Sequence, residues 1–164
     1  MLNRLCAQPV TLAGLILFSA ALAATEQQLE DPAFNRGQYL IKIAGCNDCH
    51  TPGYPENGGT TPQDQWLTGS AVGFLGPWGT SYPSNLRLYV QSVTESQWRQ
   101  RVRHPMLPPM PWFSLRDMND DDLNAIYRFI HVLGPRGEPA PKAVAPGLKV
   151  TTPYYEFMPK TPAS

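Results

Sequence analysis

Two cysteines and a histidine stand together in the segment Cys46-Asn47-Asp48-Cys49-His50. On a helical turn, thiols three residues apart lie on the same side of the helix, and the next side chain lies close to them. Each thiol can then add to one vinyl group of a haem, while the imidazole binds the iron. Because C-x-x-C-H is the attachment pattern of c-type haem, we expect Cys46 and Cys49 to hold one haem c covalently and His50 to be an axial iron ligand.

Two other chemistries use cysteines at this spacing. A thiol-disulfide redox pair is expected after a strand in a βαβ unit, whereas residues 36–45 have a helical pattern. Structural zinc needs four ligands, usually from two such pairs, and outside the pentapeptide the sequence offers Cys6, His104 and His131. The haem interpretation is therefore favoured over thiol redox chemistry and zinc binding.

The first residues of the chain favour an exported protein. Arg4 is followed by an apolar run over residues 10–23 that ends in the small-residue pattern A-L-A, as in a secretory signal peptide. The run is shorter than the roughly 20 residues of a membrane span. We therefore predict a cleaved signal peptide at residues 1–23, a periplasmic location and no stable membrane span after cleavage. An uncleaved N-terminal anchor is the alternative.

Cleavage after Ala23 would also remove Cys6 and leave Cys46 and Cys49 as the remaining thiols. Exported chains usually use cysteines for disulfides, so a single pair at haem spacing strengthens the haem interpretation. The full chain has 13 basic and 13 acidic residues, and loss of Arg4 would change its formal charge from zero to −1. This balance indicates no nucleic-acid partner.

The rest of the sequence predicts a small helical domain over residues 24–134. A first helix is expected over residues 32–45, and Gly37 would allow another helix to cross it closely. A T-x-x-Q capping box at residues 94–97 should begin a short second helix. The last helix should begin after Asn119, whose side chain can cap it.

Residues 51–93 are rich in proline and glycine and show little periodicity. A loop of this length is unusual in a compact domain, but wrapping a haem would explain it. Six side chains are expected to line the haem, although ordinary core packing explains each of them nearly as well: Trp66, Phe74, Leu75, Trp78, Tyr82 and Leu86. Residues 135–164 include seven prolines and several apolar residues, which predict an extended C-terminal strap packed on the domain.

The second axial ligand has four candidates between the second and last helices: His104, Met106, Met110 and Met118. Met118 precedes the predicted cap Asn119, where it can pack against Leu123. Met110 lies in a P-P-M-P loop, and its prolines restrict the backbone. Such a stiff loop can hold a thioether against iron with little loss of entropy.

Several segments follow a known pattern. They are R-G-Q-Y-L before the cysteines, G-P-W-G through to Asn85-Leu86, the P-P-M-P-W loop and the Asp-rich start of the last helix. Together they span residues 36–133, and they resemble a monohaem class I cytochrome c. In similar cytochromes the methionine of this loop binds the iron, so the resemblance implies Met110 as the second axial ligand. Residues 87–89 depart from the pattern, because R-L-Y stands where T-P-D often follows Asn-Leu.

We expect an all-α fold, a small cytochrome c-like domain in which the first and last helices cross and long loops wrap one haem. The expected function is periplasmic one-electron transfer with His/Met ligation, between an exported dehydrogenase and an oxidase or another cytochrome of the respiratory chain. Such a chain is an electron-transfer protein, free or as the cytochrome subunit of an oxidoreductase complex, and not an enzyme. The alternative is a haem c sensor or a peroxidase-like enzyme, which would share Cys46, Cys49 and His50.

Overall fold

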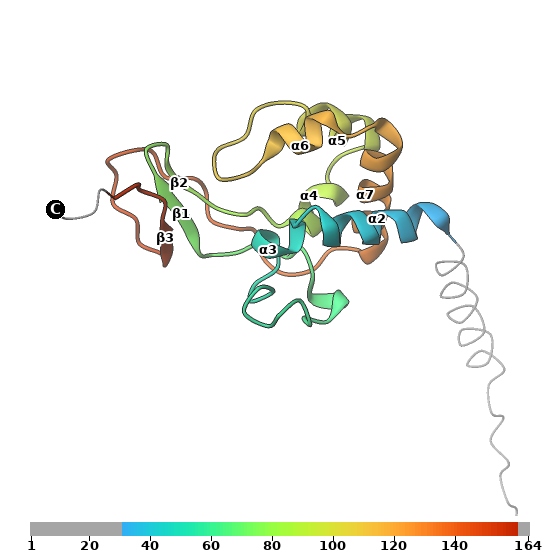
Figure 1. Ribbon diagram of the computed structural model, residues 1–164, viewed down its shortest axis with the longest axis horizontal. Helices are drawn as coiled ribbons and strands as arrows, with labels where there is room; N and C mark the ends of the chain where they lie inside the picture. Colours follow the sequence, from blue (N-terminus) through green and yellow to red (C-terminus); the bar gives the residue numbers. More distant parts are fainter. Residues whose placement is uncertain (1–30, 161–164) are drawn as a thin grey trace, which may run out of the picture. The chain divides into compact units, whose positions relative to one another are not determined.

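The computed structural model describes residues 31–160 (Figure 1). The chain divides into two units, residues 1–32 and residues 33–164, and the second unit is described below. The predicted signal peptide at residues 1–23 lies outside the described residues. Among residues 31–160, no helix has the length and apolar character needed to cross a membrane.

Helices dominate the described residues. They are α2 (Pro32–Ile43), α3 (Cys46–His50), α4 (Leu86–Gln91), α5 (Glu95–Val102), α6 (Trp112–Asp117) and α7 (Asp120–Leu133), with a short 3-10 helix η1 (Gln63–Gln65). The strands β1 (Gly73–Gly76), β2 (Gly79–Ser81) and β3 (Tyr154–Glu156) form a sheet of order β2-β1-β3. The mostly helical character was predicted, whereas the small sheet, α4 and α6 were not.

Helix α7 supplies much of the hydrophobic core. Leu123, Phe129 and Ile130 are fully buried along one face of this helix, as an amphipathic pattern requires. Trp98 of α5 donates its indole N–H to the Leu123 carbonyl at 3.0 Å. The ring of Trp66 lies 6.2 Å from that of Phe129, so Trp98 of α5 and Trp66, which precedes α4, both contact α7.

Helices α2 and α7 cross at Gly37, as predicted. A Cβ atom at this position would lie 2.1 Å from the Ala125 carbonyl oxygen and 2.7 Å from Phe129 Cβ, so a side chain cannot be accommodated there. The Arg36 guanidinium also donates from α2 to both carboxylate oxygens of Asp122 on α7, at 2.7 and 3.1 Å. This crossing fixes the direction of α2, which leads into α3.

The helix ends follow the local sequence signals. Asn119 accepts the Asp122 N–H at 2.8 Å and caps α7, and the capping box of Thr94 and Gln97 is complete at the start of α5. Asn85 accepts the Leu88 N–H at 3.0 Å and caps α4. These side chains satisfy backbone donors that a helix leaves unpaired in its first turn.

The C-terminal residues contact the β-hairpin and the loop before α4. Thr80 exchanges two backbone hydrogen bonds with Val144, and β3 pairs in parallel with β1. The Asn85 side-chain amide donates to the carbonyls of Arg136 and Glu138 at 2.8 and 3.1 Å. The domain limits at residues 24–134 and 135–164 stay predictions.

Candidate haem-binding site

Cys46, Cys49 and His50 lie together on the single turn α3. Gly45 links α2 to this turn with φ 68°, a left-handed conformation that glycine adopts without strain. Both cysteines are free and partly exposed, and His50 is buried, with 7% of its surface exposed. The structure therefore brings the three predicted attachment residues together.

The His50 ring is oriented by a backbone carbonyl. Its Nδ1 lies 2.7 Å from the Ser84 oxygen, and because a carbonyl can only accept, Nδ1 carries the proton. Burial lowers the pKa of His50, and the hydrogen bond to Ser84 opposes this shift. The imidazole is thus neutral at pH 7, and its Nε2 has no hydrogen-bond partner among residues 31–160. A neutral imidazole with one nitrogen fixed by a carbonyl is the form that binds a metal.

Buried hydrogen bonds link α3 and the adjacent Thr51 to the segment around residues 67–69. The Thr51 hydroxyl donates to the Asn47 side-chain oxygen and accepts the Leu67 N–H, both at 2.8 Å. The Gly69 N–H donates to the His50 carbonyl at 2.8 Å. The predicted ligand therefore sits on a turn that is tied to the segment around residues 67–69.

Both thiols are protonated at neutral pH. Burial raises the pKa of Cys46 to about 12, and burial followed by the nearby Asp48 carboxylate raises the pKa of Cys49. A reactive thiol-disulfide pair needs the opposite shift, because the thiolate is the nucleophile. Among residues 31–160, no three His, Cys, Asp or Glu side chains converge as they would around a metal ion. The raised thiol pKa values therefore argue against a reactive thiol-disulfide pair.

The candidates for the second ligand lie between α5 and α7. Met106, Met110 and Met118 are all partly buried against the core, whereas His104 is exposed. The Met110 N–H donates to the Leu107 carbonyl at 3.3 Å, so Met110 lies in a turn of the loop. Burial does not distinguish the methionines, and Met110 as an iron ligand stays a prediction.

One segment, residues 81–84, contacts both α3, which carries His50, and the methionine loop, residues 104–111, which carries Met110. Ser84 accepts the His50 Nδ1–H through its carbonyl, and Ser81, three residues earlier, donates its hydroxyl to the Pro108 carbonyl. Neither serine was identified from the sequence. Ser84 contributes its backbone carbonyl, which every residue type has, so the sequence could not predict its role. Ser81 contributes a side-chain hydroxyl, but serine is too common for this to identify it.

The predicted lining side chains are accounted for mainly by protein contacts. The indole N–H of Trp66 donates to the Thr61 carbonyl at 2.7 Å, and the residue is part of the core. Phe74 packs between Tyr155 and Phe157, with ring centroids 5.8 and 5.4 Å away. These contacts agree with ordinary packing, the alternative that the sequence left open.

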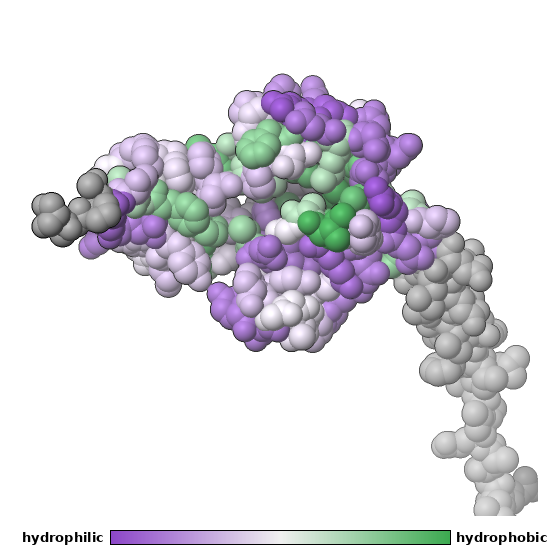
Figure 2. Space-filling model, in the orientation of Figure 1, coloured by the Kyte–Doolittle hydropathy of each residue, from purple (hydrophilic) through white to green (hydrophobic). Residues whose placement is uncertain are grey.

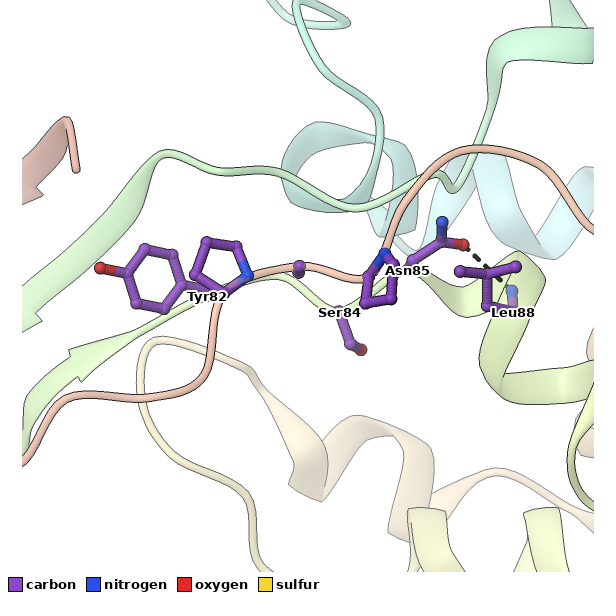
Figure 3. Close-up of a pocket in the computed structure, with 7 residues that line it drawn as sticks. Tyr82, Ser84, Asn85 and Leu88 are labelled. Carbon is purple, nitrogen blue, oxygen red and sulfur yellow. Dashed lines mark hydrogen bonds between the residues drawn. The ribbon is translucent and has the colours of Figure 1, made fainter.

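A pocket of about 230 Å³ lies beside Ser84 (Figure 3). Tyr82, Ser84, Asn85 and Leu88 line it together with residues 139–141. Tyr82 is one of the six predicted lining side chains, whereas Cys46, Cys49, His50 and Met110 do not line this pocket. Elsewhere, Figure 2 shows apolar residues gathered in a hollow at the centre of the visible face.

Two known proteins are similar to this chain. It is 26% identical over 147 residues to the fructose dehydrogenase cytochrome subunit of Gluconobacter japonicus. The alignment covers 82% of this chain and 28% of that protein. It is also 26% identical over 137 residues to the gluconate 2-dehydrogenase cytochrome c subunit of Pantoea cypripedii. This alignment covers 74% of this chain and 28% of that protein. The chain thus spans less than a third of the length of either relative. No protein-family model matches it, and no solved structure gives a significant match.

Both relatives are named as cytochrome subunits of dehydrogenases. The similarity supports a cytochrome c with a role in electron transfer. These names agree with the prediction that the chain is an electron-transfer component rather than an enzyme in its own right.

Proposed function

We propose that this protein is an exported one-electron carrier with one haem c, attached through Cys46 and Cys49 and ligated by His50. The observation that carries the proposal is the His50 geometry. Its imidazole is buried and neutral, Nδ1–H is committed to the Ser84 carbonyl, and Nε2 is left to bind iron. The sequence contains a single C-x-x-C-H motif, which supports one haem.

The residues of the chain would hold the haem from two sides. Thioether bonds from Cys46 and Cys49 would fix it against α3, with His50 on one face and Met110 on the other. When bound, haem iron supplies the redox chemistry by cycling between Fe(III) and Fe(II). His/Met ligation tends to raise the haem potential, which suits a carrier that accepts electrons from a dehydrogenase.

The partners are inferred from the relatives and from the predicted compartment. Both relatives are cytochrome subunits of dehydrogenases, named for fructose and for gluconate, so an exported dehydrogenase is the proposed donor. The proposed acceptor is an oxidase or another cytochrome of the respiratory chain. The periplasmic location rests on the predicted signal peptide at residues 1–23.

Covalent attachment is the first test of this function. The protein should be produced in a host that exports it and attaches haem c. Haem should stay with the wild-type polypeptide through acid-acetone extraction and denaturing electrophoresis, and the Cys46→Ser/Cys49→Ser variant should lose it. Cys6→Ser is the matched control, because Cys6 precedes the predicted cleavage site, and it should keep the haem. Quantitative haem release from the wild type, or one zinc per chain without haem, would refute the proposal.

Carbon monoxide binding distinguishes an electron carrier from a haem sensor or a peroxidase-like enzyme. A carrier with two axial ligands should bind carbon monoxide poorly in its reduced form at neutral pH and turn over hydrogen peroxide negligibly. An enzyme needs an open iron position and an acid-base group beside it. Rapid, stoichiometric carbon monoxide binding by the wild type would favour a ligand-binding or catalytic haem protein.

A further inference from the structure

Ser81 connects the sheet to the methionine loop. It is the last residue of β2, and its backbone is paired with Phe74 of β1, so its position is fixed by the hairpin. Its hydroxyl donates to the carbonyl of Pro108, two residues before Met110. Among the described residues, no other side-chain hydrogen bond joins residues 104–111 to a residue outside this loop.

The ends of this loop are held in other ways. At its start, Arg103 donates to the Arg116 carbonyl at 2.7 Å and pairs with the Asp120 carboxylate. At its end, the Trp112 N–H donates to the Met110 carbonyl at 2.9 Å. Between these points most side chains are exposed, while Met106 and Met110 are partly buried against the core.

Ser81 also belongs to the segment that orients His50. The Ser84 carbonyl, three residues later, accepts the His50 Nδ1–H at 2.7 Å. One short segment therefore contacts the turn of the first predicted ligand and the loop of the second. Any displacement of Pro108 from Ser81 would move Met110 relative to His50.

We infer that Ser81 is a positioning residue for Met110, because its hydroxyl ties the loop that carries Met110 to the segment that orients His50. This inference rests on the proposed His50/Met110 ligation. Ser81 does not touch the iron itself. Its hydroxyl restricts the opening of residues 104–111, and so it limits the time during which the distal position is free.

The test compares three variants of the haem-loaded protein. Ser81→Ala removes the hydroxyl, and Ser81→Thr keeps it in a residue that suits a strand. Ser92→Ala is the matched control, because the Ser92 hydroxyl also donates to a carbonyl, that of Tyr89, but at the end of α4. Because the bond is exposed, its loss should raise the open fraction of the loop only about twofold.

Two measurements report on this opening. The rate of carbon monoxide binding to the reduced protein should rise about twofold in Ser81→Ala and stay near the wild-type rate in Ser81→Thr and Ser92→Ala. Hydrogen exchange of the Met110 and Trp112 amides should accelerate by the same factor in Ser81→Ala. Equal behaviour of Ser81→Ala and Ser92→Ala in both measurements would overturn the inference.

Failure of the proposed ligation gives a different result. In that case the oxidised wild type lacks the weak sulfur-to-iron band at the red end of the visible spectrum, or Met110→Ala retains it. If the wild type has the band and Met110→Ala loses it, the ligation stands. The Ser81 variants then test the positioning role alone.

Discussion

The two sides of the proposed haem site are held by different kinds of contact. On the His50 side, Thr51 is fully buried and bonds both Asn47 and the Leu67 N–H at 2.8 Å. On the methionine side, residues 104–111 are mostly exposed, and the hydroxyl of Ser81 reaches them at Pro108.

This difference indicates that protein contacts alone fix the His50 turn more firmly than the loop that carries Met110. A buried polar group that loses its partner is costly, whereas an exposed one can bond water instead. The turn carrying His50 is therefore fixed by the fold. In the proposed haem site, the position of Met110 would depend more on its bond to the iron and on the stiffness of the P-P-M-P loop.

The largest expected effect comes from removing the proposed distal ligand. Met110→Ala should abolish the sulfur-to-iron absorption band of the oxidised protein and allow rapid carbon monoxide binding after reduction, because the sixth position becomes open. Covalent haem should be retained, since Cys46 and Cys49 are unchanged. Absorption spectroscopy and stopped-flow mixing with carbon monoxide measure these changes.

Met106→Ala is the matched control for this variant. Met106 lies on the same loop and is also partly buried, so its loss should affect packing while preserving the band. The reverse pattern, or a bis-histidine spectrum in the wild type, would show that Met110 is not the ligand.

A buried bond on the His50 side should have the next largest effect. Thr51→Val leaves the Asn47 oxygen and the Leu67 N–H without their shared partner, and it should lower the free energy of unfolding by about 3 kcal/mol. Urea denaturation of the haem-loaded protein measures this change.

Thr60 provides the comparison for Thr51. Its hydroxyl also bonds a protein oxygen, the Asn57 carbonyl at 2.7 Å, but in an exposed turn. Thr60→Val should change the free energy of unfolding by less than about 0.5 kcal/mol. Similar losses in the two variants would contradict the view that the His50 side is fixed by buried bonds.

The smallest effect is expected at the surface ion pair of the α2–α7 crossing. The Arg36 hydrogen bond lowers the pKa of Asp122, so the folded protein binds this proton less readily than the unfolded chain does. The resulting stabilisation is present above the ordinary pKa of 3.8 and is lost as the pH falls through the lower folded value. Arg36→Gln should therefore reduce stability slightly at neutral pH and flatten its decline below about pH 4.

Unfolding midpoints measured between pH 3 and pH 7 would test this pair. Arg101→Gln removes the same charge from an exposed position that forms no ion pair among the described residues, and its pH dependence should match that of the wild type. No difference between the Arg36 and Arg101 variants would show that solvent screens the α2–α7 pair completely.

The sequence predicted the elements whose signals are local. The C-x-x-C-H turn, the Asn119 cap and the capping box at Thr94 each depend on residues within one helical turn. Gly37 predicted the close crossing of the first and last helices, because the absence of a side chain permits that approach. Helix α4 was missed although Asn85 caps it, since six residues are too few to show a clear period.

Contacts between distant residues were decided by the tertiary structure alone. Strand β3 pairs with β1 although Gly73 and Tyr154 are 81 positions apart in the sequence, and strands of three or four residues carry no readable alternation. Arg87 stands where the cytochrome pattern differs, and it is buried, with its guanidinium donating to the carbonyls of Leu133 and Gly134 at the end of α7.

The candidate site shows the same division. Residue types and their spacing pointed to Cys46, Cys49 and His50 as the predicted haem residues, because thioether formation and iron ligation depend on side-chain chemistry. The Ser84 carbonyl that orients His50 and the Pro108 carbonyl that accepts from Ser81 are backbone groups, which every residue has. Only the folded chain decides which carbonyl comes within hydrogen-bonding distance of which donor.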